Sequence, residues 1–409
     1  MKTTNLLMGL ALAALTVAPA SAQYLITLND MTRITLDDPN LTFVGEGQDD
    51  AAIQVGDETV PLAQISSITP ADPDAQKPYV IAYHPYYAGS DQLPPADKLT
   101  HVNYSFAEVV VKDGVYNGFK LQGSFATMRR TLNLKNDNPN LKVMLSFTHS
   151  VVTIGNKQDG GFSAIAASDE YRKKFAQDCV DYMEQYGIDG IDLDWEFPGL
   201  SWSGAACDPA HDVDNYTLLV KQMRETFGDR YLLTFAGYCM NVRGSGNNRK
   251  YIDVKAVEPY VDFVNIMTYD FASAPGYHNA IKHSSSYWDI VRTIADYRKA
   301  GFPMEKIVLG IPFYLRHDWD STMTYPKIMA LKESDGYKVD NWNETAQVPY
   351  VTLNGKFYGS YDNPRSIERK AKYAAEQGLR GLFYWCTYED DANRTLTNAL
   401  YKYTMMYMR

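Results

Sequence analysis

The stretch Tyr186-Gly-Ile-Asp-Gly-Ile-Asp-Leu-Asp-Trp-Glu-Phe-Pro-Gly199 places Asp192, Asp194 and Glu196 at alternate positions. Side chains two apart in a β-strand share a face, so the three carboxylates point one way and the apolar residues between them point the other way. A buried strand without chemistry is expected to carry Val, Ile or Leu instead, because clustered carboxylates repel one another and resist burial. The alternative is a solvated edge strand with an acidic outer face. Because a turn signal ends the strand at Phe197-Pro-Gly199, we favour a functional site.

A regular alternation of strands and helices surrounds this stretch. Helix-periodic segments such as Ser168–Tyr186 lie between short apolar runs, with Ser168 as the expected N-cap. Eight repeats predict an α/β fold, a (β/α)8 TIM barrel, whose active site lies at the C-terminal ends of the strands. The eight expected strands are Tyr79–Tyr83, His101–Ala107, Lys142–Phe147, Ile188–Trp195, Tyr231–Gly237, Val261–Met267, Ile307–Phe313 and Arg380–Trp385.

The chain before the barrel has a different rhythm. Short alternating runs separated by turn residues predict a small β-rich N-terminal unit over residues 23–69, followed by a Pro-rich linker at 70–78. This unit either packs against the barrel or binds a partner or surface. The barrel is expected over 79–409, with a short insertion at about 315–362 that contains a hairpin at Asn354-Gly355.

The first residues and the composition indicate an exported globular protein. Residues 1–22 have a charged start, a short apolar run and an Ala-Ser-Ala end, which predicts a signal peptide and a periplasmic or extracellular location. No membrane span is expected, because the apolar run is short. The net charge of −10 argues against nucleic acid as a partner. The four scattered cysteines favour buried free thiols over a disulfide framework, although export permits a bridge.

The run Asp189-Gly-Ile-Asp-Leu-Asp-Trp-Glu196 resembles the DGxDxDxE signature of glycoside hydrolase family 18, which contains chitinases and endo-β-N-acetylglucosaminidases. The resemblance implies that Glu196 acts as acid and then base. Asp194 would orient the 2-acetamido group of the substrate, whose carbonyl is the nucleophile in this family. Asp192 would tune the charge of Asp194. The negative charges of Asp192 and Asp194 close by would also raise the cost of ionising Glu196 and keep it protonated. Such chemistry implies no cofactor and no metal.

Further residues at strand ends extend the resemblance over about 330 residues, from Tyr79 to the end of the chain. Tyr269, within Met267-Thr-Tyr-Asp270, would hydrogen-bond the acetamido carbonyl, and Trp385 would form the floor of the −1 sugar pocket. Each of these residues alone is more simply a core aromatic or a satisfied hydroxyl. Their joint position on different strands favours a site. The implied substrate-binding residues are Tyr83, Ser146, Met267, Asp270, Tyr314 and Trp385.

The sequence also departs from the family pattern. The motif of the third strand reads Ser146-Phe-Thr-His149, without the usual glycines, and His149 either replaces a +1 contact or has no role. Trp202 and Trp342 are candidates for subsite aromatics or for packing. The insertion before the eighth strand is expected to be reduced, which implies a shallow, open groove and an endo-acting enzyme.

The expected function is therefore retaining, substrate-assisted endo-hydrolysis of β-1,4 bonds next to N-acetylglucosamine in chitin or chitooligosaccharides. One alternative is an endo-β-N-acetylglucosaminidase that cuts the chitobiose core of N-glycans with the same residues. Another is a lectin-like barrel, but such relatives lose the catalytic Glu or its Asp partners. The expected partner in every case is a polysaccharide or oligosaccharide that contains N-acetylglucosamine.

Overall fold

The computed structural model describes residues 24–29, 33–36, 42–45, 51–55, 58–70, 77–149, 161–200, 206–242, 250–283 and 288–408. The predicted signal peptide, most of the linker and Trp202 lie outside these ranges. The chain forms two compact units, one of residues 1–78 with 402–409 and one of residues 79–401.

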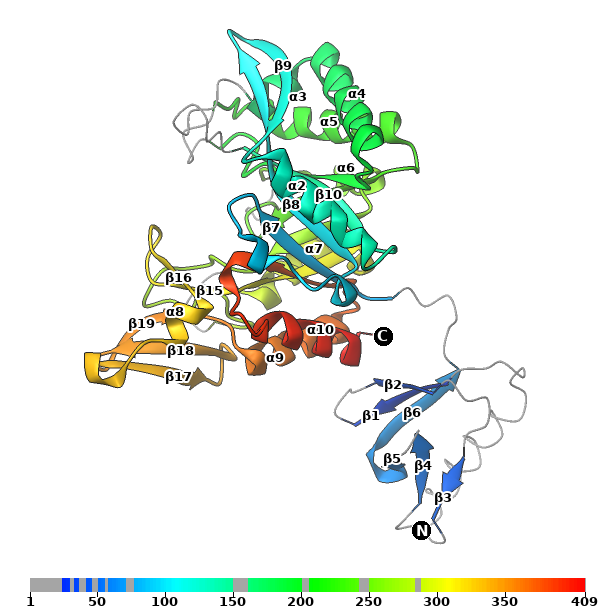
Figure 1. Ribbon diagram of the computed structural model, residues 1–409, viewed down its shortest axis with the longest axis vertical. Helices are drawn as coiled ribbons and strands as arrows, with labels where there is room; N and C mark the ends of the chain where they lie inside the picture. The colour runs from blue at the N-terminus through cyan, green and yellow to red at the C-terminus, as the bar shows by residue number, and fades with distance from the viewer. Residues whose placement is uncertain are drawn as a thin grey trace. The chain divides into compact units, whose positions relative to one another are not determined.

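Eight parallel strands of the larger unit form a closed barrel (Figure 1). Each strand pairs with the next in the chain, and the last, β20, pairs with β7, so no strand of the ring is left with a free edge. The predicted (β/α)8 barrel is confirmed, and each predicted strand overlaps an observed one. The strands are β7 (Tyr79–Pro85), β8 (His101–Lys112), β10 (Lys142–Thr148), β11 (Gly190–Asp194), β12 (Leu232–Tyr238), β13 (Phe263–Met267), β14 (Ile307–Pro312) and β20 (Gly381–Trp385).

Strand β11 carries the acidic run through the centre of the fold. All five of its residues are buried, between β10 and β12. It begins at Gly190, where a Cβ atom would lie 2.4 Å from the carbonyl oxygen of Leu232 and 2.7 Å from the Cε atom of Met144. Only glycine allows this close approach, which fixes the height at which the carboxylates leave the barrel.

Helices cover the outside of the barrel (Figure 1). Ser168 caps α4, where its side chain accepts the Tyr171 N–H, and Gly187 ends the helix in the left-handed conformation, so the predicted N-cap is confirmed. Helices α3, α4 and α5 pack against one another. The helices are α2 (Phe125–Asn133), α3 (Gly161–Ala167), α4 (Asp169–Tyr186), α5 (Asp212–Phe227), α6 (Val254–Val257), α7 (Ile290–Lys299), α9 (Pro364–Gln377) and α10 (Thr395–Tyr407).

The segment between β14 and β20 forms a sheet of its own. It folds into a five-stranded antiparallel sheet with helix α8 (Tyr325–Met329), and these elements occupy the part of the chain expected for the insertion. Its strands are short and partly exposed, which gives them a weak apolar pattern in the sequence. The predicted hairpin at Asn354-Gly355 is confirmed between β18 and β19. The strands are β15 (Tyr314–Arg316), β16 (Thr322–Thr324), β17 (Tyr337–Asn343), β18 (Val348–Leu353) and β19 (Lys356–Ser360).

The N-terminal unit consists of two small antiparallel sheets, with the strand orders β2-β1-β6 and β3-β4-β5. The side chains of Tyr24, Ile26 and Ile53 are buried in it. The strands are β1 (Tyr24–Leu28), β2 (Arg33–Leu36), β3 (Phe43–Val44), β4 (Ala52–Val55), β5 (Glu58–Pro61) and β6 (Ile65–Pro70).

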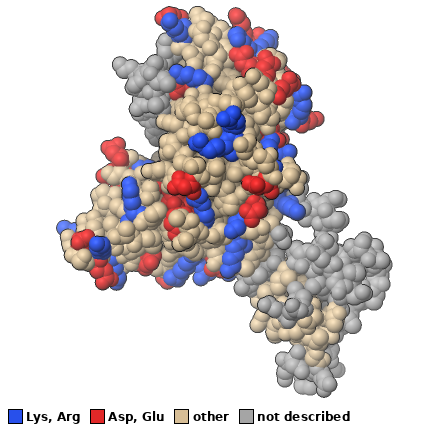
Figure 2. All heavy atoms as spheres, in the orientation of Figure 1, with Lys and Arg blue, Asp and Glu red and all other residues tan. Residues whose placement is uncertain are grey.

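Three further features can be compared with what the composition indicated: the state of the cysteines, the distribution of charged side chains and the character of the helices. Cys179, Cys239 and Cys386 are buried and Cys207 is half-buried, and in the described structure none of the four forms a disulfide, as expected. Basic and acidic side chains are mixed over the face of the barrel unit that Figure 2 shows. Within the described ranges, no helix has the length and apolar character needed to cross a membrane.

Candidate active site

A cleft of about 430 Å³ opens at the C-terminal ends of the barrel strands. Seven of the ten residues expected to form the site line it, and the other three lie beneath. The insertion also contributes to its wall, through Arg316 and Thr322. The cleft is lined by Phe106, Thr148, His149, Asp194, Glu196, Met267, Tyr269, Asp270, Tyr314, Arg316, Thr322, Trp385 and Glu389.

Asp192 lies below the cleft, fully buried and surrounded by hydrogen-bond donors. Its Oδ2 atom accepts from the Tyr83 hydroxyl at 2.9 Å and from Ser146 Oγ at 2.7 Å. Its Oδ1 atom accepts from Thr234 Oγ1 at 2.6 Å and from Asn265 Nδ2 at 3.4 Å. Burial raises the pKa of Asp192, whereas these four hydrogen bonds favour the carboxylate and oppose the rise. The set can therefore hold a negative charge under the cleft.

Asp194 and Glu196 are hydrogen-bonded to each other at the mouth of the barrel. Burial raises the pKa of Asp194 well above its usual range, and the charges of Glu196 and Asp192 add to the rise. Burial and the charge of Asp270 raise the pKa of Glu196 to about 7, whereas its bond to Asp194 lowers it. The neighbouring charge that keeps Glu196 protonated is thus that of Asp270, rather than those of Asp192 and Asp194 as the sequence suggested. Asp194 Oδ1 is enclosed and has no hydrogen-bond partner among the described residues.

Asp270 carries the stable negative charge of the cleft. Tyr314 donates its hydroxyl to Oδ1 at 2.8 Å, and Arg316 forms a bidentate pair with both carboxylate oxygens, at 2.5 and 3.0 Å. Burial raises the pKa of Asp270, but His278 and Arg316 together lower it to about 2. Burial lowers the pKa of His278, and its Nδ1 atom accepts the Asp270 N–H. The imidazole is therefore neutral, and we assign the effect on Asp270 mainly to Arg316.

Aromatic and sulfur-containing side chains form the apolar part of the cleft. The ring of Trp385, at the end of β20, stacks on Phe106 with the centroids 5.6 Å apart. Met267 ends β13, Tyr269 follows two residues later, and both line the cleft. His149 has a structural role in the cleft, because its Nδ1 atom accepts a hydrogen bond from the Glu196 N–H at 3.3 Å, next to the Asp194–Glu196 pair.

A model of the family described as "Glycosyl hydrolases family 18" matches residues 78–390. The chain belongs to glycoside hydrolase family 18. The match covers all eight barrel strands and the insertion, and it contains every residue of the cleft. The resemblance seen in the acidic run is therefore confirmed.

Relatives within family 18 carry the names of chitinases and related enzymes. Chitinase A1 of Niallia circulans is 31% identical over 65% of this chain and 43% of its own length. Chitinase B of Serratia marcescens is 24% identical over 85% of this chain and 83% of its own. A family 18 N-acetylglucosaminidase from Paenibacillus barengoltzii has 26% identity and a TM-score of 0.65, over 80% of this chain and 99% of that one. The chain thus spans less than half of the first of these relatives.

The sequence analysis did not identify several residues that line the family 18 cleft or lie directly beneath it. Thr234 is the register partner of Asp192 on β12, as Ser146 is on β10, so a polar residue at matching positions of adjacent strands was the available signal. Arg316 and Glu389 come from the insertion and from the turn after β20, and no local pattern marks either of them.

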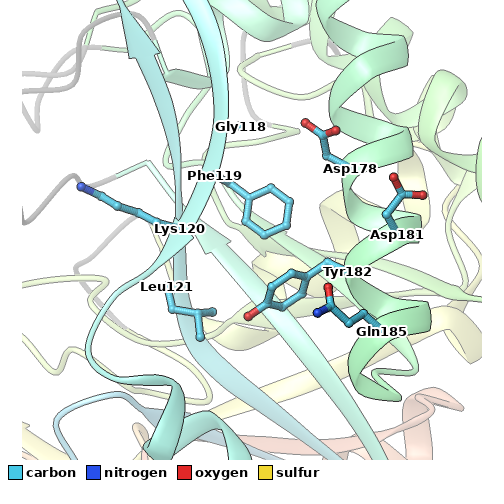
Figure 3. Close-up of a pocket in the computed structure, with 8 residues that line it drawn as sticks. All are labelled: Gly118, Phe119, Lys120, Leu121, Asp178, Asp181, Tyr182 and Gln185. Carbon is cyan, nitrogen blue, oxygen red and sulfur yellow. The ribbon is translucent and has the colours of Figure 1, made fainter.

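A second hollow, of about 270 Å³, lies between β9 (Val115–Leu121) and α4, away from the family 18 cleft (Figure 3). The rings of Phe119 and Tyr182 meet edge to face there, with the centroids 5.2 Å apart. Asp178 accepts a hydrogen bond from the Tyr116 hydroxyl and forms an ion pair with Lys174. Because no predicted site residue lines this hollow, we place the candidate active site in the cleft.

Proposed function

We propose that this protein hydrolyses β-1,4 bonds next to N-acetylglucosamine in chitin or chitooligosaccharides, by a retaining and substrate-assisted mechanism. The observation that carries the proposal is the Asp194–Glu196 pair at the barrel mouth. One carboxyl there holds a proton to about neutral pH, and no described residue forms a hydrogen bond with Asp194 Oδ1. The names of the relatives support chitin as the substrate.

Glu196 supplies the proton in the first step. Its protonated carboxyl donates to the glycosidic oxygen, while the carbonyl oxygen of the substrate's 2-acetamido group attacks the anomeric carbon. The bond to the leaving sugar breaks, and an oxazolinium ion forms on the −1 sugar. The acetamido N–H donates to Asp194, and the Tyr269 hydroxyl, which lines the cleft, donates to the acetamido oxygen.

Water completes the reaction. The Glu196 carboxylate takes a proton from a water molecule, which attacks the anomeric carbon and opens the oxazolinium ring. Two inversions at this carbon give net retention, and Glu196 regains its proton. Asp192 contributes from below, because its buried charge favours the positive ring and a proton on Asp194. Trp385 forms the apolar floor beneath the reacting sugar.

Product analysis of two substrates tests the proposal. Wild type is expected to cleave a chitin tetramer, and Glu196→Gln is expected to lose at least about 100-fold in turnover, the range for removing a general acid. Glu305→Gln, at an exposed residue far in sequence from the acidic run, makes the same substitution as a control. Undiminished turnover in Glu196→Gln contradicts the mechanism. Release of intact glycan from a high-mannose glycoprotein, without cleavage of the tetramer, favours the endo-β-N-acetylglucosaminidase.

We further propose that the protein is exported and acts on polysaccharide outside the cytoplasm. The charged and apolar start of the chain supports export, and N-terminal sequencing of the secreted protein checks it. A mature chain that begins at Gln23 is expected. A chain that retains Met1 contradicts this proposal.

A further inference from the structure

A fourth acid lines the cleft and has no part in the reaction described above. Glu389 ends the 3-10 turn Thr387–Glu389, directly after β20, and its N–H donates to the Cys386 carbonyl oxygen at 3.0 Å. Its side chain is only 9% exposed, although it lines the same cleft as Asp194 and Trp385. Its Oε2 atom is enclosed, and none of the described residues forms a hydrogen bond with it.

Ionisation of a carboxyl group that is buried without a partner costs free energy. Burial raises the pKa of Glu389 to about 7, and only the charge of Lys327 opposes the rise. No ion pair joins these two residues within the described structure. Buried carboxylates in proteins are normally paired with a cation or a strong donor, because desolvation otherwise disfavours the charge. Glu389 therefore lacks the partner that its position calls for.

The remainder of the cleft supplies no such partner. Its other carboxyl groups, those of Asp194, Glu196 and Asp270, have the same sign when ionised. Among the described residues that line it, the permanent positive charge is that of Arg316, and both carboxylate oxygens of Asp270 already bind this guanidinium. The electrostatic complement of this cleft is thus a ligand that brings its own positive charge.

Two exposed rings mark the space beside Glu389 as a surface for a sugar. Tyr388 precedes it in the turn, and Tyr87 lies in the loop after β7. Their rings meet edge-on with the centroids 5.4 Å apart, and the two residues are 38% and 50% exposed. Amphipathic rings of this kind offer an apolar face to a ligand and a hydroxyl at its rim.

We propose that Glu389 binds the C2 ammonium group of a glucosamine unit, so that the preferred substrate is partly deacetylated chitin rather than the fully acetylated polymer. This inference rests on the proposed function. The −1 sugar must keep its acetyl group, because the acetamido carbonyl is the nucleophile, and the glucosamine therefore occupies another subsite. The ammonium donates to the carboxylate, and the resulting charge-assisted pair keeps Glu389 ionised in the complex.

Competition between two substrates tests the proposal. Wild type, Glu389→Gln, Glu389→Asp and the control Glu305→Gln are each given a partly acetylated chitosan and a fully acetylated hexamer, and the ratio of the two kcat/KM values is measured. Glu389→Gln is expected to lower this ratio about tenfold, as loss of a hydrogen bond between charged groups implies. Glu389→Asp is expected to keep part of the preference, and Glu305→Gln all of it.

The wild-type products provide a measurement that does not depend on the folding of a variant. Sequencing of the chitosan products is expected to give N-acetylglucosamine at every new reducing end and glucosamine enriched at one fixed distance from the cut. A random placement of glucosamine overturns the proposal, as does a ratio in folded Glu389→Gln within about twofold of wild type. Failure of wild type to cleave either substrate contradicts the proposed function instead.

Discussion

Individual side chains set the protonation states on which the cleft depends. Asp270 is held ionised by Arg316, and its charge helps to keep Glu196 protonated to about pH 7. Because the proposed acid must carry its proton, the reaction is expected to slow as the pH rises through the pKa of Glu196. The alkaline limb of the profile of kcat/KM against pH should therefore lie near neutrality.

Asp270→Asn should move this alkaline limb to lower pH. The substitution removes a negative charge that raises the pKa of Glu196, and it leaves the positive Arg316 unpaired nearby, which acts in the same direction. The pH dependence of kcat/KM on a chitin tetramer is the measurement. Asp229→Asn, on the exposed turn after α5, is the control. An alkaline limb that stays in place in Asp270→Asn would show that burial alone sets the pKa.

Thr234→Val should destabilise the fold by about 2 kcal/mol at neutral pH, because it removes a hydrogen bond to a buried carboxylate without changing side-chain size. Burial raises the folded-state pKa of Asp192, so the contribution of this group to stability is lost as the pH rises through that pKa. The missing donor affects the ionised form, and the loss should therefore shrink in acid. The measurement is the free energy of unfolding in urea, at neutral and at acidic pH. Thr226→Val on α5 is the control.

The sequence revealed the residues whose pattern is local. Asp192, Asp194 and Glu196 occupy alternate positions at the end of β11 and just after it, so their pattern is visible in the sequence. The positions of Arg316 and Glu389 depend on how the insertion and the turn after β20 close over the barrel, and no spacing along the chain encodes this. The pairing of Asp270 with Arg316 reversed one electrostatic expectation for the same reason.

Among the elements, β11 depends on a glycine at its start. Gly190→Ala should destabilise the fold by about 3 kcal/mol, because the new methyl group meets the backbone of β12. Gly187→Ala, three residues earlier, meets open space and should cost only about 1 kcal/mol for its left-handed conformation. Urea unfolding of both variants is the measurement. Equal losses would mean that the barrel can absorb the methyl group.

The end of the insertion is tied to α9 by a fully buried ion pair. Lys370 Nζ lies 2.6 Å from Asp362 Oδ2, and Asn279 also donates to this oxygen. Lys370→Met should cost about 3–5 kcal/mol in stability, because it leaves the carboxylate without its cation. The double variant with Asp362→Leu should recover part of the loss in thermal unfolding. If Lys370→Met alone leaves the stability unchanged, the hydrogen bonds to Asp362 are enough to stabilise its carboxylate.

Elements with a strong apolar period were predictable, and short exposed ones were not. The eight barrel strands alternate with helices, and each was found to within a few residues. The hairpin β8–β9 was missed even though Asp113-Gly114, with positive φ at both residues, is a known hairpin signal. The insertion sheet has strands of three to seven residues with mixed exposure, and its apolar pattern is correspondingly weak.

At the scale of the whole molecule, every residue of the cleft lies within the unit 79–401. Removal of residues 23–77 should therefore leave kcat/KM for a soluble tetramer within about twofold of the full chain, while any role of this segment in binding polymer would be lost. Assays on the tetramer and on insoluble chitin separate these effects. A large loss on the tetramer would mean that the N-terminal unit supports the barrel.

The pairing of β20 with β7 makes the first and last strands of the barrel neighbours. Any strand of the closed ring can therefore come first in the sequence. The order in which the strands are synthesised can change while their neighbours in the barrel stay the same. A circularly permuted gene, with Tyr401 linked to Tyr79 and new termini at the exposed turn Gly228-Asp229, should encode the same barrel. In such a chain β12 would be made first, and the acidic strand β11 last.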